Sequence, residues 1–399
     1  MLNHLSKLSY KFSTNAIFIF YSIIGDLLLS QESFGKFSTI MAIEILIFNI
    51  SDFFNIRYLL SKFATNQKDF FFKKIFQFKL SLGIFSIVLL SPIFFAYNIP
   101  WYYIIVLIVI NYVQMLTSTI ATYIFTNTKD FKLLFSNIVG AMMGFIYIMV
   151  NYYIDKNITI FTLLISMLFY RMGELIVLYQ KELITFSSCY QYSYDDIKEA
   201  FPFYIQLVIS MGSAKLFMLF LPSLITYTDI SIIATYEYTL AIPLFLISVL
   251  TMSTYTQLYH NKLDIDFKKN HYNNIVSKYY KKAMLISVLF MFIQLIYILT
   301  IKLTLIPYLP YLFIQDITIV FSSMQGFLLF FWKLHKAYIT ITIVLFFVKN
   351  TVMLYLISIY GISGYFWIAV FLEVSILLYI QYIIYGKRQN TIKQVIINE

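Results

Sequence analysis

The sequence predicts an all-α polytopic membrane protein with 12 transmembrane helices in two six-helix lobes and both termini cytoplasmic. Three observations give this prediction. Of the 399 residues, 60% are hydrophobic and 12% are charged, about half the charged fraction of a soluble domain. Twelve apolar runs each approach the length of about 20 residues that crosses a bilayer. Basic residues are concentrated in alternate connections between these runs.

The apolar runs follow one another along the whole chain, separated by polar segments. Lys7 and Lys11 flank the first run, which lacks a small-x-small cleavage site and leads into further apolar runs. We therefore interpret it as a membrane helix and not as a signal peptide. The predicted spans are 14–30, 37–56, 76–96, 101–125, 133–153, 158–180, 201–226, 231–256, 283–301, 308–331, 337–357 and 364–385.

The distribution of Lys and Arg predicts the orientation. The connections on one side hold only Lys36, Lys156 and Lys302, whereas the segments on the other side hold 23 basic residues, including those counted in Arg57–Lys79. By the positive-inside rule the second side is cytoplasmic, together with both termini. An error of one span would remove this asymmetry, so the charge distribution also supports the count of twelve.

Connection lengths predict how the spans are grouped. Every outward connection is short, whereas the cytoplasmic ones include 58–75, 181–200 and 258–282. The loop 181–200 falls at the midpoint, so we expect an N-terminal lobe at 1–190 and a C-terminal lobe at 191–399, a common transporter plan. The basic and aromatic connection 258–282 is either a helix lying at the anionic inner leaflet, which we prefer, or a solvated linker.

The positions of proline and glycine in the predicted spans are typical of a packed helix bundle. Pro202 suits a helix start, Pro222 and Pro243 interrupt the two central helices, and Tyr227–Ile230 is expected as the turn between them. The prolines either create kinks that open and close a cavity or reflect ordinary proline use in membrane helices. In the fifth span, the segment GAMMG places Gly140 and Gly144 four apart, a pattern typical of close helix contacts.

Ionisable residues inside the spans are the candidate functional groups, because charges at membrane depth normally pair or line a pathway. Arg171 and Glu174 are three residues apart on one helix and are expected to pair. Lys215 has no carboxylate within one helical turn. Lys215 and Lys349 either pair with a residue such as Glu237 or Glu373 across a helix interface or provide a cationic lining for an anionic substrate. The candidates for substrate binding are Lys215, Lys349 and Arg171, and those for ion coupling are Asp26, Glu44 and Glu237.

The sequence contains no recognisable catalytic or metal motif. His4, His260, His271 and His335 all fall in cytoplasmic segments, and Cys189 is the single cysteine. A Gly-rich phosphate loop, an H-E-x-x-H motif and a carboxylate pair in an outer loop are all missing from the sequence. We interpret Asp195–Asp196 as the start of the helix that enters the membrane at Pro202. The sequence therefore predicts a protein without catalytic residues, metal or cofactor.

Three stretches resemble the polysaccharide flippases, a family that carries lipid-linked O-antigen and capsule repeats. SFGKFSTIMAIEILIFNISDFFNIRYLLSKFA, at Ser33–Ala64, resembles their second-helix region. AFPFYIQLVISMGSAKLFMLFLPSLI, followed by ATYEYTLAIPLFLISVLTMSTYTQLY, resembles their seventh and eighth helices. IYGISGYFWIAVFLEVSILLYIQYIIYGK, at Ile359–Lys387, is similar to their last helix. The family belongs to the multidrug/oligosaccharidyl-lipid/polysaccharide exporter superfamily.

The resemblance implies two six-helix lobes with helices 1, 2, 7 and 8 lining a central cavity. Asp26, Glu44, Lys215 and Glu237 lie one on each of those predicted helices. The implied substrate is an undecaprenyl-diphosphate-linked oligosaccharide, moved from the cytoplasmic to the outer leaflet of the bacterial inner membrane. The implied partners are the bilayer and the polymerase and chain-length regulator of the same pathway, with no nucleic acid. Ala214 departs from the family, whose members often have an acidic residue there.

Two alternative functions remain open at this point. A polysaccharide polymerase or membrane glycosyltransferase has similar length and aromatic content, but a large outer catalytic loop is expected for it, whereas the outer connections here are short. A drug or cation exporter of the same superfamily has the same fold. For it we expect an acidic, aromatic cavity without a central lysine, so the charge lining the cavity distinguishes it from a flippase.

Overall fold

The computed structural model describes residues 19–63, 68–126, 130–179, 194–211, 215–262, 269–331 and 334–397. Within these ranges the regular elements are helices, and no strand occurs. The chain divides into two compact units. The N-terminal unit comprises Met1–Pro222 and Thr226–Ser231, and the C-terminal unit comprises Ser223–Ile225 and Ile232–Glu399. The predicted boundary between 190 and 191 lies outside the described residues and stays a prediction.

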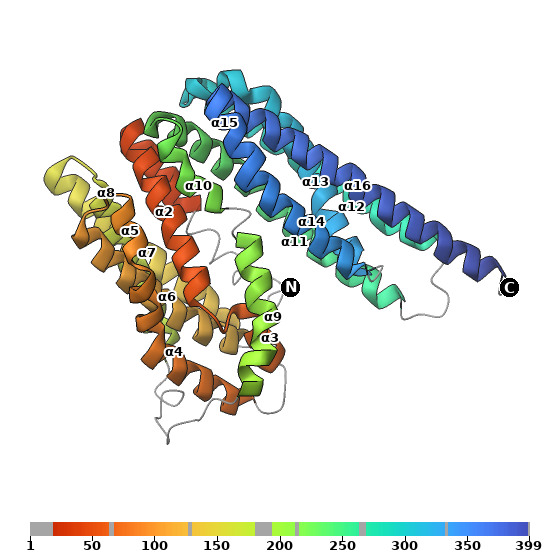
Figure 1. The fold of residues 1–399 in the computed structure, drawn as a ribbon, viewed down its shortest axis with the longest axis horizontal. Coiled ribbons are helices and arrows are strands. Elements are labelled where there is room, and N and C mark those ends of the chain that lie inside the picture. Colours follow the sequence, from red (N-terminus) through yellow and green to blue (C-terminus); the bar gives the residue numbers. More distant parts are fainter. Residues whose placement is uncertain are drawn as a thin grey trace. The chain divides into compact units, whose positions relative to one another are not determined.

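The N-terminal unit is a bundle in which α7 and α8 lie side by side and α8 also packs against α6 (Figure 1). Helix α2 contacts α4, α6, α8, α9 and α10, so it is the central helix of the unit. The helices are Ile19–Leu28, α2 (Gln31–Ser51), α3 (Ile56–Phe63), α4 (Lys68–Leu90), α5 (Pro92–Ala96), α6 (Trp101–Thr126), α7 (Asp130–Asp155), α8 (Ile160–Leu178), α9 (Tyr194–Met211) and α10 (Phe217–Phe220).

In the C-terminal unit α13 packs against both α12 and α16. A π-helical turn at Lys349–Met353 joins α14 to α15, and Gly361, with φ +59°, separates α15 from α16. This positive φ suits glycine because it has no Cβ. The helices are α11 (Tyr227–Lys262), of which Tyr227–Ser231 belong to the N-terminal unit, α12 (Lys269–Thr300), α13 (Leu309–Phe331), α14 (His335–Val348), α15 (Leu354–Tyr360) and α16 (Ile362–Ile397), with a 3-10 helix at Leu303–Tyr308.

The helices have the length and surface of membrane spans. In the described part of the chain, eight helices are long and apolar enough to cross a bilayer, or nine if the bent pair Asp69–Ser81 and Gly83–Ala96 is one span. On α12 the side chains of Leu285, Leu289, Phe292 and Ile296 are all exposed and share one helix face. A stripe of this kind faces lipid in a membrane protein. The chain is therefore a multi-pass membrane protein, while twelve spans and cytoplasmic termini stay predictions.

Glycines bring α7 and α8 together, as the GAMMG segment predicts. A Cβ added to Gly140 would lie 2.7 Å from the carbonyl oxygen of Tyr170. One added to Gly144 would lie 2.5 Å from the Tyr21 hydroxyl oxygen. On the facing helix, a Cβ at Gly173 would lie 2.9 Å from the Cα of Gly140. The prediction of a small-residue contact at Gly140 and Gly144 is therefore confirmed.

The expected turn at Tyr227–Ile230 is wrong, because these residues form the first turn of α11. Their helical state follows from a cap: the backbone N–H of Asp229 donates to the hydroxyl of Thr226, which itself donates to the Asp229 carboxylate at 2.8 Å. The preceding span is also shorter than predicted, since α10 ends at Phe220 and a 3-10 turn follows at Leu221–Ser223. Pro222 lies in that turn. Because proline has no backbone N–H, it cannot donate the hydrogen bond that would continue the α-helix.

Three other expectations about helix boundaries need correction. Helix α9 begins at Tyr194, with Asp195 and Asp196 in its first turn as predicted, so Pro202 lies inside the helix and not at its start. Pro243 lies inside α11, which continues on both sides of it. The connection 258–282 is not a separate surface helix in its described part, because α11 extends to Lys262 and α12 begins at Lys269.

Candidate functional site

Two carboxyl groups and one guanidinium meet inside the N-terminal unit. Glu44 lies on α2 and is 0% exposed, while Arg171 and Glu174 lie one turn apart on α8 and are 3% and 5% exposed. Arg171 donates from Nη1 to Glu174 Oε2 at 2.7 Å, which confirms the predicted pairing. The charge of Arg171 also acts on Glu44. The two Glu44 oxygens and Arg171 Nη2 are buried and have no hydrogen-bond partner in the described structure. We call these three residues the Glu44 cluster.

Hydroxyl groups on three helices fix the surroundings of this cluster. The Tyr21 hydroxyl lies 2.7 Å from Ser166 Oγ, and Ser166 donates to the carbonyl oxygen of Gly144 at 2.8 Å. On the next turn of α8, Tyr170 donates to Asn137 Oδ1 at 3.2 Å. The first helix, α7 and α8 are thus tied together around Arg171, because Ser166 and Tyr170 precede it on the same helix.

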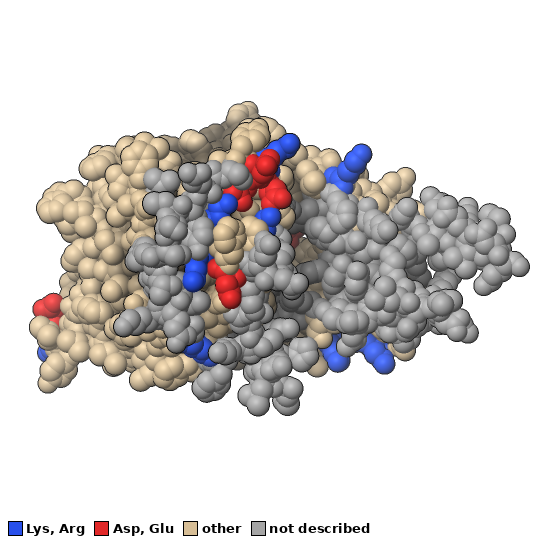
Figure 2. Space-filling view, turned by 90° about the horizontal axis from the view of Figure 1, so that it is seen from below, with Lys and Arg blue, Asp and Glu red and all other residues tan. Residues whose placement is uncertain are grey.

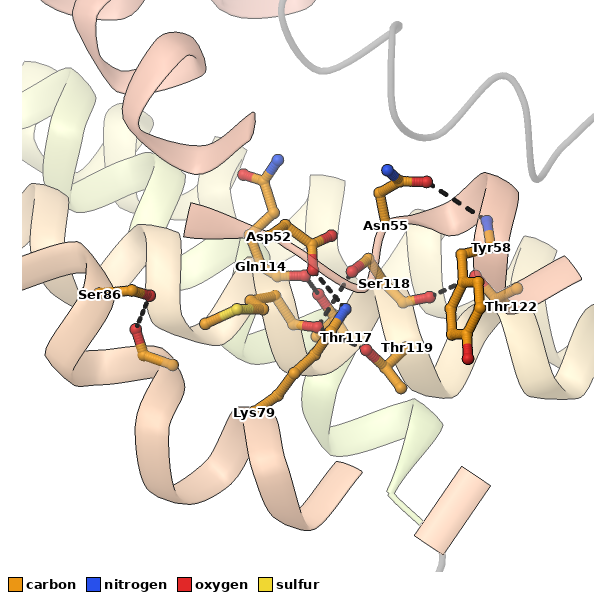
Figure 3. A network of polar contacts seen from close by, with 12 residues as sticks. Asp52, Asn55, Tyr58, Lys79, Ser86, Gln114, Thr117, Ser118, Thr119 and Thr122 are labelled. Atoms are coloured by element: carbon orange, nitrogen blue, oxygen red, sulfur yellow. Dashed lines mark hydrogen bonds and ion pairs between the residues drawn. The ribbon is translucent and has the colours of Figure 1, made fainter. Parts of the chain in front are cut away.

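A second buried ion pair lies where α2 ends. Lys79 Nζ on α4 is 2.5 Å from Asp52 Oδ1, and their side chains are 2% and 5% exposed. Figure 3 shows this pair beside Gln114, Thr117 and Thr119 of α6. The sequence analysis counts Lys79 among the basic residues of the cytoplasmic side, and the structure places it inside α4, buried within the bundle. An ammonium inside the bundle is stable only with a close anionic partner, and Asp52 provides it.

The hydroxyl-rich face of α6 completes the network in Figure 3. Thr117 and Thr119 donate to backbone carbonyls one turn earlier, so their own donors are satisfied within α6. In contrast, the buried side-chain oxygens of Ser51, Asn111 and Gln114 have no hydrogen-bond partner in the described structure. Buried polar atoms of this kind usually bind ordered water. The end of α2 is therefore surrounded by polar groups inside an otherwise apolar bundle.

Helix α9 is held to the first helices by ion pairs and aromatic contacts. Asp196 binds Lys74 of α4 at 2.5 Å, and Glu199 binds Lys62 of α3. Figure 2 shows acidic and basic side chains next to one another on the surface at this end of the molecule. Tyr204 donates to the carbonyl oxygen of Ile50 at 2.9 Å. By these contacts α9 belongs to the N-terminal unit.

The other candidates of the N-terminal unit are Asp26 and Lys215. Asp26 lies on the first described helix and is 6% exposed. Lys215 is half-buried and lies in a π-helical turn immediately before α10, with residues 212–214 outside the described part of the chain. Both side chains have electrostatic or hydrogen-bond interactions. Of the predicted site residues in this unit, the structure brings together Glu44 and Arg171.

The C-terminal unit contains two further polar groups of residues. Tyr365 donates to Glu237 Oε1 at 3.3 Å. Separately, the Thr318 hydroxyl donates to Glu373 Oε2 at 3.2 Å, and the charge of Lys349 acts on Glu373. Lys349 therefore lies near Glu373, one of the two partners that the sequence suggests for it.

Asp316 is a buried acid that the sequence-based list of site residues omits. It is 0% exposed, and Gln294 Nε2 is 3.5 Å from its Oδ1 and 3.0 Å from the carbonyl oxygen of Thr239. Asp316 Oδ2 and Gln294 Oε1 are buried without a hydrogen-bond partner in the described structure. The available signal was the position of Asp316 inside a predicted span. Its contact with Gln294, 22 residues away, depends on helix packing.

No family model and no curated protein sequence matches the chain. Solved structures do match it. The lipid II flippase MurJ in an inward closed conformation has a TM-score of 0.64 and 15% identity, covering 95% of this chain and 87% of that chain. A MATE transporter in complex with MaD3S has a TM-score of 0.59 and 14% identity, covering 97% and 96%. An inward-facing multidrug resistance MATE family transporter of the MOP superfamily has a TM-score of 0.56 and 12% identity, covering 95% and 96%.

The chain shares the fold of these proteins. The match covers nearly the whole chain, so this fold accounts for both units and not for one alone. The neighbours are transporters and a flippase, which agrees with the prediction that the chain is not an enzyme. At these identities the likeness shows the fold alone, and the substrate has to be inferred from the residues of this chain.

Proposed function

We propose that the chain is a flippase that moves polyprenyl-diphosphate-linked oligosaccharides from the cytoplasmic to the outer leaflet of the bacterial inner membrane. The observation that supports this most is the fold similarity to a lipid II flippase over 95% of the chain. The short predicted outer connections and the resemblance to polysaccharide flippases agree with it. The resulting substrate is an undecaprenyl-diphosphate repeat unit for O-antigen or capsule, delivered to the polymerase and chain-length regulator of that pathway.

Lys215 and Lys349 are the proposed contacts for the diphosphate or an acidic sugar. Both lie in predicted spans and both side chains are half-buried, so each ammonium keeps some access to its surroundings. Ammonium groups bind phosphate as point charges. Arg171 differs, because it is 3% exposed and bound to Glu174, so a substrate contact requires a different conformation of α8. Asp26, Glu44 and Glu237 are the proposed ion-coupling residues, and the substrate moves by alternating access.

The proposal is tested by deleting the gene and measuring which leaflet holds the lipid-linked repeat. We expect single repeats to accumulate on the inner leaflet and polymer to be lost. Wild-type protein should restore polymer, whereas Lys215→Ala should be inserted in the membrane at normal level and restore less than about a tenth of it, a change worth about 1.4 kcal/mol in the transition state. Repeats that reach the outer leaflet in the deletion strain would contradict the proposal, and normal polymer with Lys215→Ala would contradict the role of Lys215.

A drug or cation exporter is the second candidate, because MATE transporters also match the whole chain. Buried acids such as Glu44 and Asp316 are compatible with it. This candidate predicts that deletion leaves the lipid-linked repeat correctly distributed and increases sensitivity to cationic drugs. The polymerase alternative loses its support, since the matching folds are those of transporters.

A further inference from the structure

The first part of α12 is basic and extends beyond its apolar part. The helix covers Lys269–Thr300, 32 residues, which is about 48 Å at the usual rise per residue. A hydrocarbon core of about 30 Å is filled by the apolar part that begins at Ala283. The residues before it, KNHYNNIVSKYYKK, include four lysines and no acid. They therefore lie at the headgroups of one leaflet, the cytoplasmic one in the predicted orientation.

The buried face of α12 holds the helix in the C-terminal unit. Tyr279 donates to the carbonyl oxygen of Val320 at 2.9 Å, and Thr251 Oγ1 on α11 lies 3.0 Å from the same hydroxyl. Ser287, about two turns further on, donates to the carbonyl oxygen of Asp316 at 3.1 Å. Helix α12 is thus fixed on this side by contacts with α11 and α13, so its other face is turned away from the unit.

The opposite face of α12 is exposed and changes from basic to apolar within one turn. Lys278, Lys281 and Lys282 are exposed, and the last two lie three and four residues after the first, so the three side chains are neighbours on the helix surface. Leu285 follows after less than one turn and is 72% exposed. The exposed residues that share this face, which we call the α12 stripe, are Lys278, Lys281, Lys282, Leu285, Leu289, Phe292 and Ile296.

The charges of the α12 stripe are not compensated by side chains in the described part of the chain. Lysines of the N-terminal unit such as Lys62 and Lys74 bind carboxylates of α9. The ion pairs of the described residues do not include Lys278, Lys281 or Lys282. Helix α12 also has no carboxylate that could pair with them one turn away. In the described structure, three neighbouring ammonium groups are thus available for an anion from outside the chain.

We propose that the α12 stripe binds an anionic phospholipid of the leaflet at the start of α12. The ammonium groups contact the lipid phosphate, because ammonium ions bind phosphate as point charges. The acyl chain lies along Leu285, Leu289 and Phe292. The depths agree, because Lys278 and Lys282 precede Leu285 by about 10 Å and about 5 Å along the helix axis. The lysines are therefore beside the headgroup where Leu285 enters the core, and basic residues at this depth attract anionic lipids.

A second copy of the chain fits the α12 stripe less well. A symmetric pair of chains brings the same face of both copies together. In a shared membrane the lysines of the two copies then lie at the same depth and repel one another. An anionic lipid has the opposite charge and an apolar tail, so it matches both parts of the stripe. The inference does not depend on which substrate the protein transports, because it concerns a lipid of the surrounding bilayer.

Lipid binding is measured on the purified full-length protein in an uncharged detergent. The thermal unfolding midpoint is recorded with phosphatidylglycerol, with phosphatidylcholine of the same chain length, and with inorganic phosphate, all at equal concentration. A ligand that binds only the folded state raises the midpoint. We expect phosphatidylglycerol to raise it by about 2 °C or more beyond phosphatidylcholine, and inorganic phosphate to leave it unchanged. About 0.5 M NaCl should reduce the difference between the two lipids, because salt screens exposed charges.

A triple variant with Lys278→Gln, Lys281→Gln and Lys282→Gln locates the site. It changes exposed side chains, and it should lose most of the difference between the two lipids. Lys282→Gln alone should lose part of the difference, and it provides the test if the triple variant does not fold. Native mass spectrometry counts the bound lipids: the wild type should retain phosphatidylglycerol and the triple variant should not.

The matched control removes three other exposed lysines and so has the same net charge as the triple variant. Its substitutions are Lys156→Gln, Lys198→Gln and Lys336→Gln, and it should keep the wild-type response. Equal rises with both lipids, a rise with inorganic phosphate alone, or equal responses of the triple variant and the control would overturn the inference. A lipid-free dimer that is lost in the triple variant would also overturn it, because the stripe would then belong to a second copy.

Discussion

At the scale of single residues, the Asp52–Lys79 pair shows how charge is tolerated inside this bundle. Each side chain is nearly inaccessible, and the two charged atoms are 2.5 Å apart. Removing one member of a buried pair leaves an uncompensated charge, whereas removing both leaves a neutral site. The pair joins the residue after α2 to the middle of α4, so it fixes the direction in which the chain leaves the central helix.

We therefore expect Asp52→Asn and Lys79→Met each to lower the free energy of unfolding by about 3–5 kcal/mol. The double variant should lie closer to the wild type than either single variant. Thermal unfolding of the purified variants, followed by size-exclusion chromatography, measures the difference. Lys36→Met is the matched control: its pair with Glu32 is exposed, and pairs of that kind contribute about 1 kcal/mol or less. A double variant whose loss of stability equals the sum of the two single losses would show that the two charges act independently.

At the scale of helices, the contact between α7 and α8 depends on glycine. At Gly140 a Cβ would be 2.7 Å from a backbone oxygen of the neighbouring helix, and that oxygen cannot move away as a flexible side chain can. A Cβ added to Gly326, inside α13, would have no atom of the described structure within 4 Å. These two helical glycines therefore form a matched pair for testing close packing.

Gly140→Ala should lower the free energy of unfolding by about 1–3 kcal/mol, because the helices must separate to accept the methyl group. Gly326→Ala should leave stability unchanged or raise it by up to about 1 kcal/mol, since alanine favours a helix interior. Unfolding midpoints and expression levels of the two variants provide the comparison. Equal effects at both positions would mean that the α7–α8 contact is looser than the structure shows.

Helix-scale features differ in how far the sequence reveals them. The Arg171–Glu174 pair and the Gly140–Gly144 contact depend on spacing within one helix, so they are predictable from sequence. The Asp52–Lys79 pair and the Gln294–Asp316 contact join different helices, and no local pattern indicates which helices meet. The sequence predicts the start of α11 wrongly for a different reason, which is local. Tyr227–Ile230 is a polar segment after an apolar run, a pattern that also marks a turn between two spans. The hydrogen bonds between Thr226 and Asp229 instead make it the start of a helix.

At the scale of the whole molecule, the basic residues and the apolar helices together predict how the chain is oriented in the membrane. Eight or nine helices of the described chain qualify as spans by length and composition, whereas the sequence predicts twelve. The difference concerns regions such as 14–30 and 201–226, which contain residues outside the described ranges, and the long helix α11. The charge asymmetry of the connections gives an independent test of the topology, because one extra or missing span reverses the side of every later connection.

Single-cysteine labelling in intact cells measures that topology directly. Cys189→Ser provides a background without cysteine, into which Asn157→Cys and Asn274→Cys are introduced separately. Asn157 is exposed between α7 and α8, and Asn274 is exposed near the start of α12. With both termini inside, a membrane-impermeant maleimide should label position 157 in intact cells and position 274 only after permeabilisation.

The labelling result depends on the number of crossings between the two positions. The predicted topology places three helices there, at 158–180, 201–226 and 231–256, and three crossings carry the chain from the outer to the inner side. Protection of position 274 therefore requires the interrupted helix at 201–226 to cross completely. Labelling of both positions from outside would require an even number of crossings. If the segment 201–226 enters and leaves on the same side, position 274 becomes accessible from outside, and Lys215 would then lie in a re-entrant segment and not in a spanning helix.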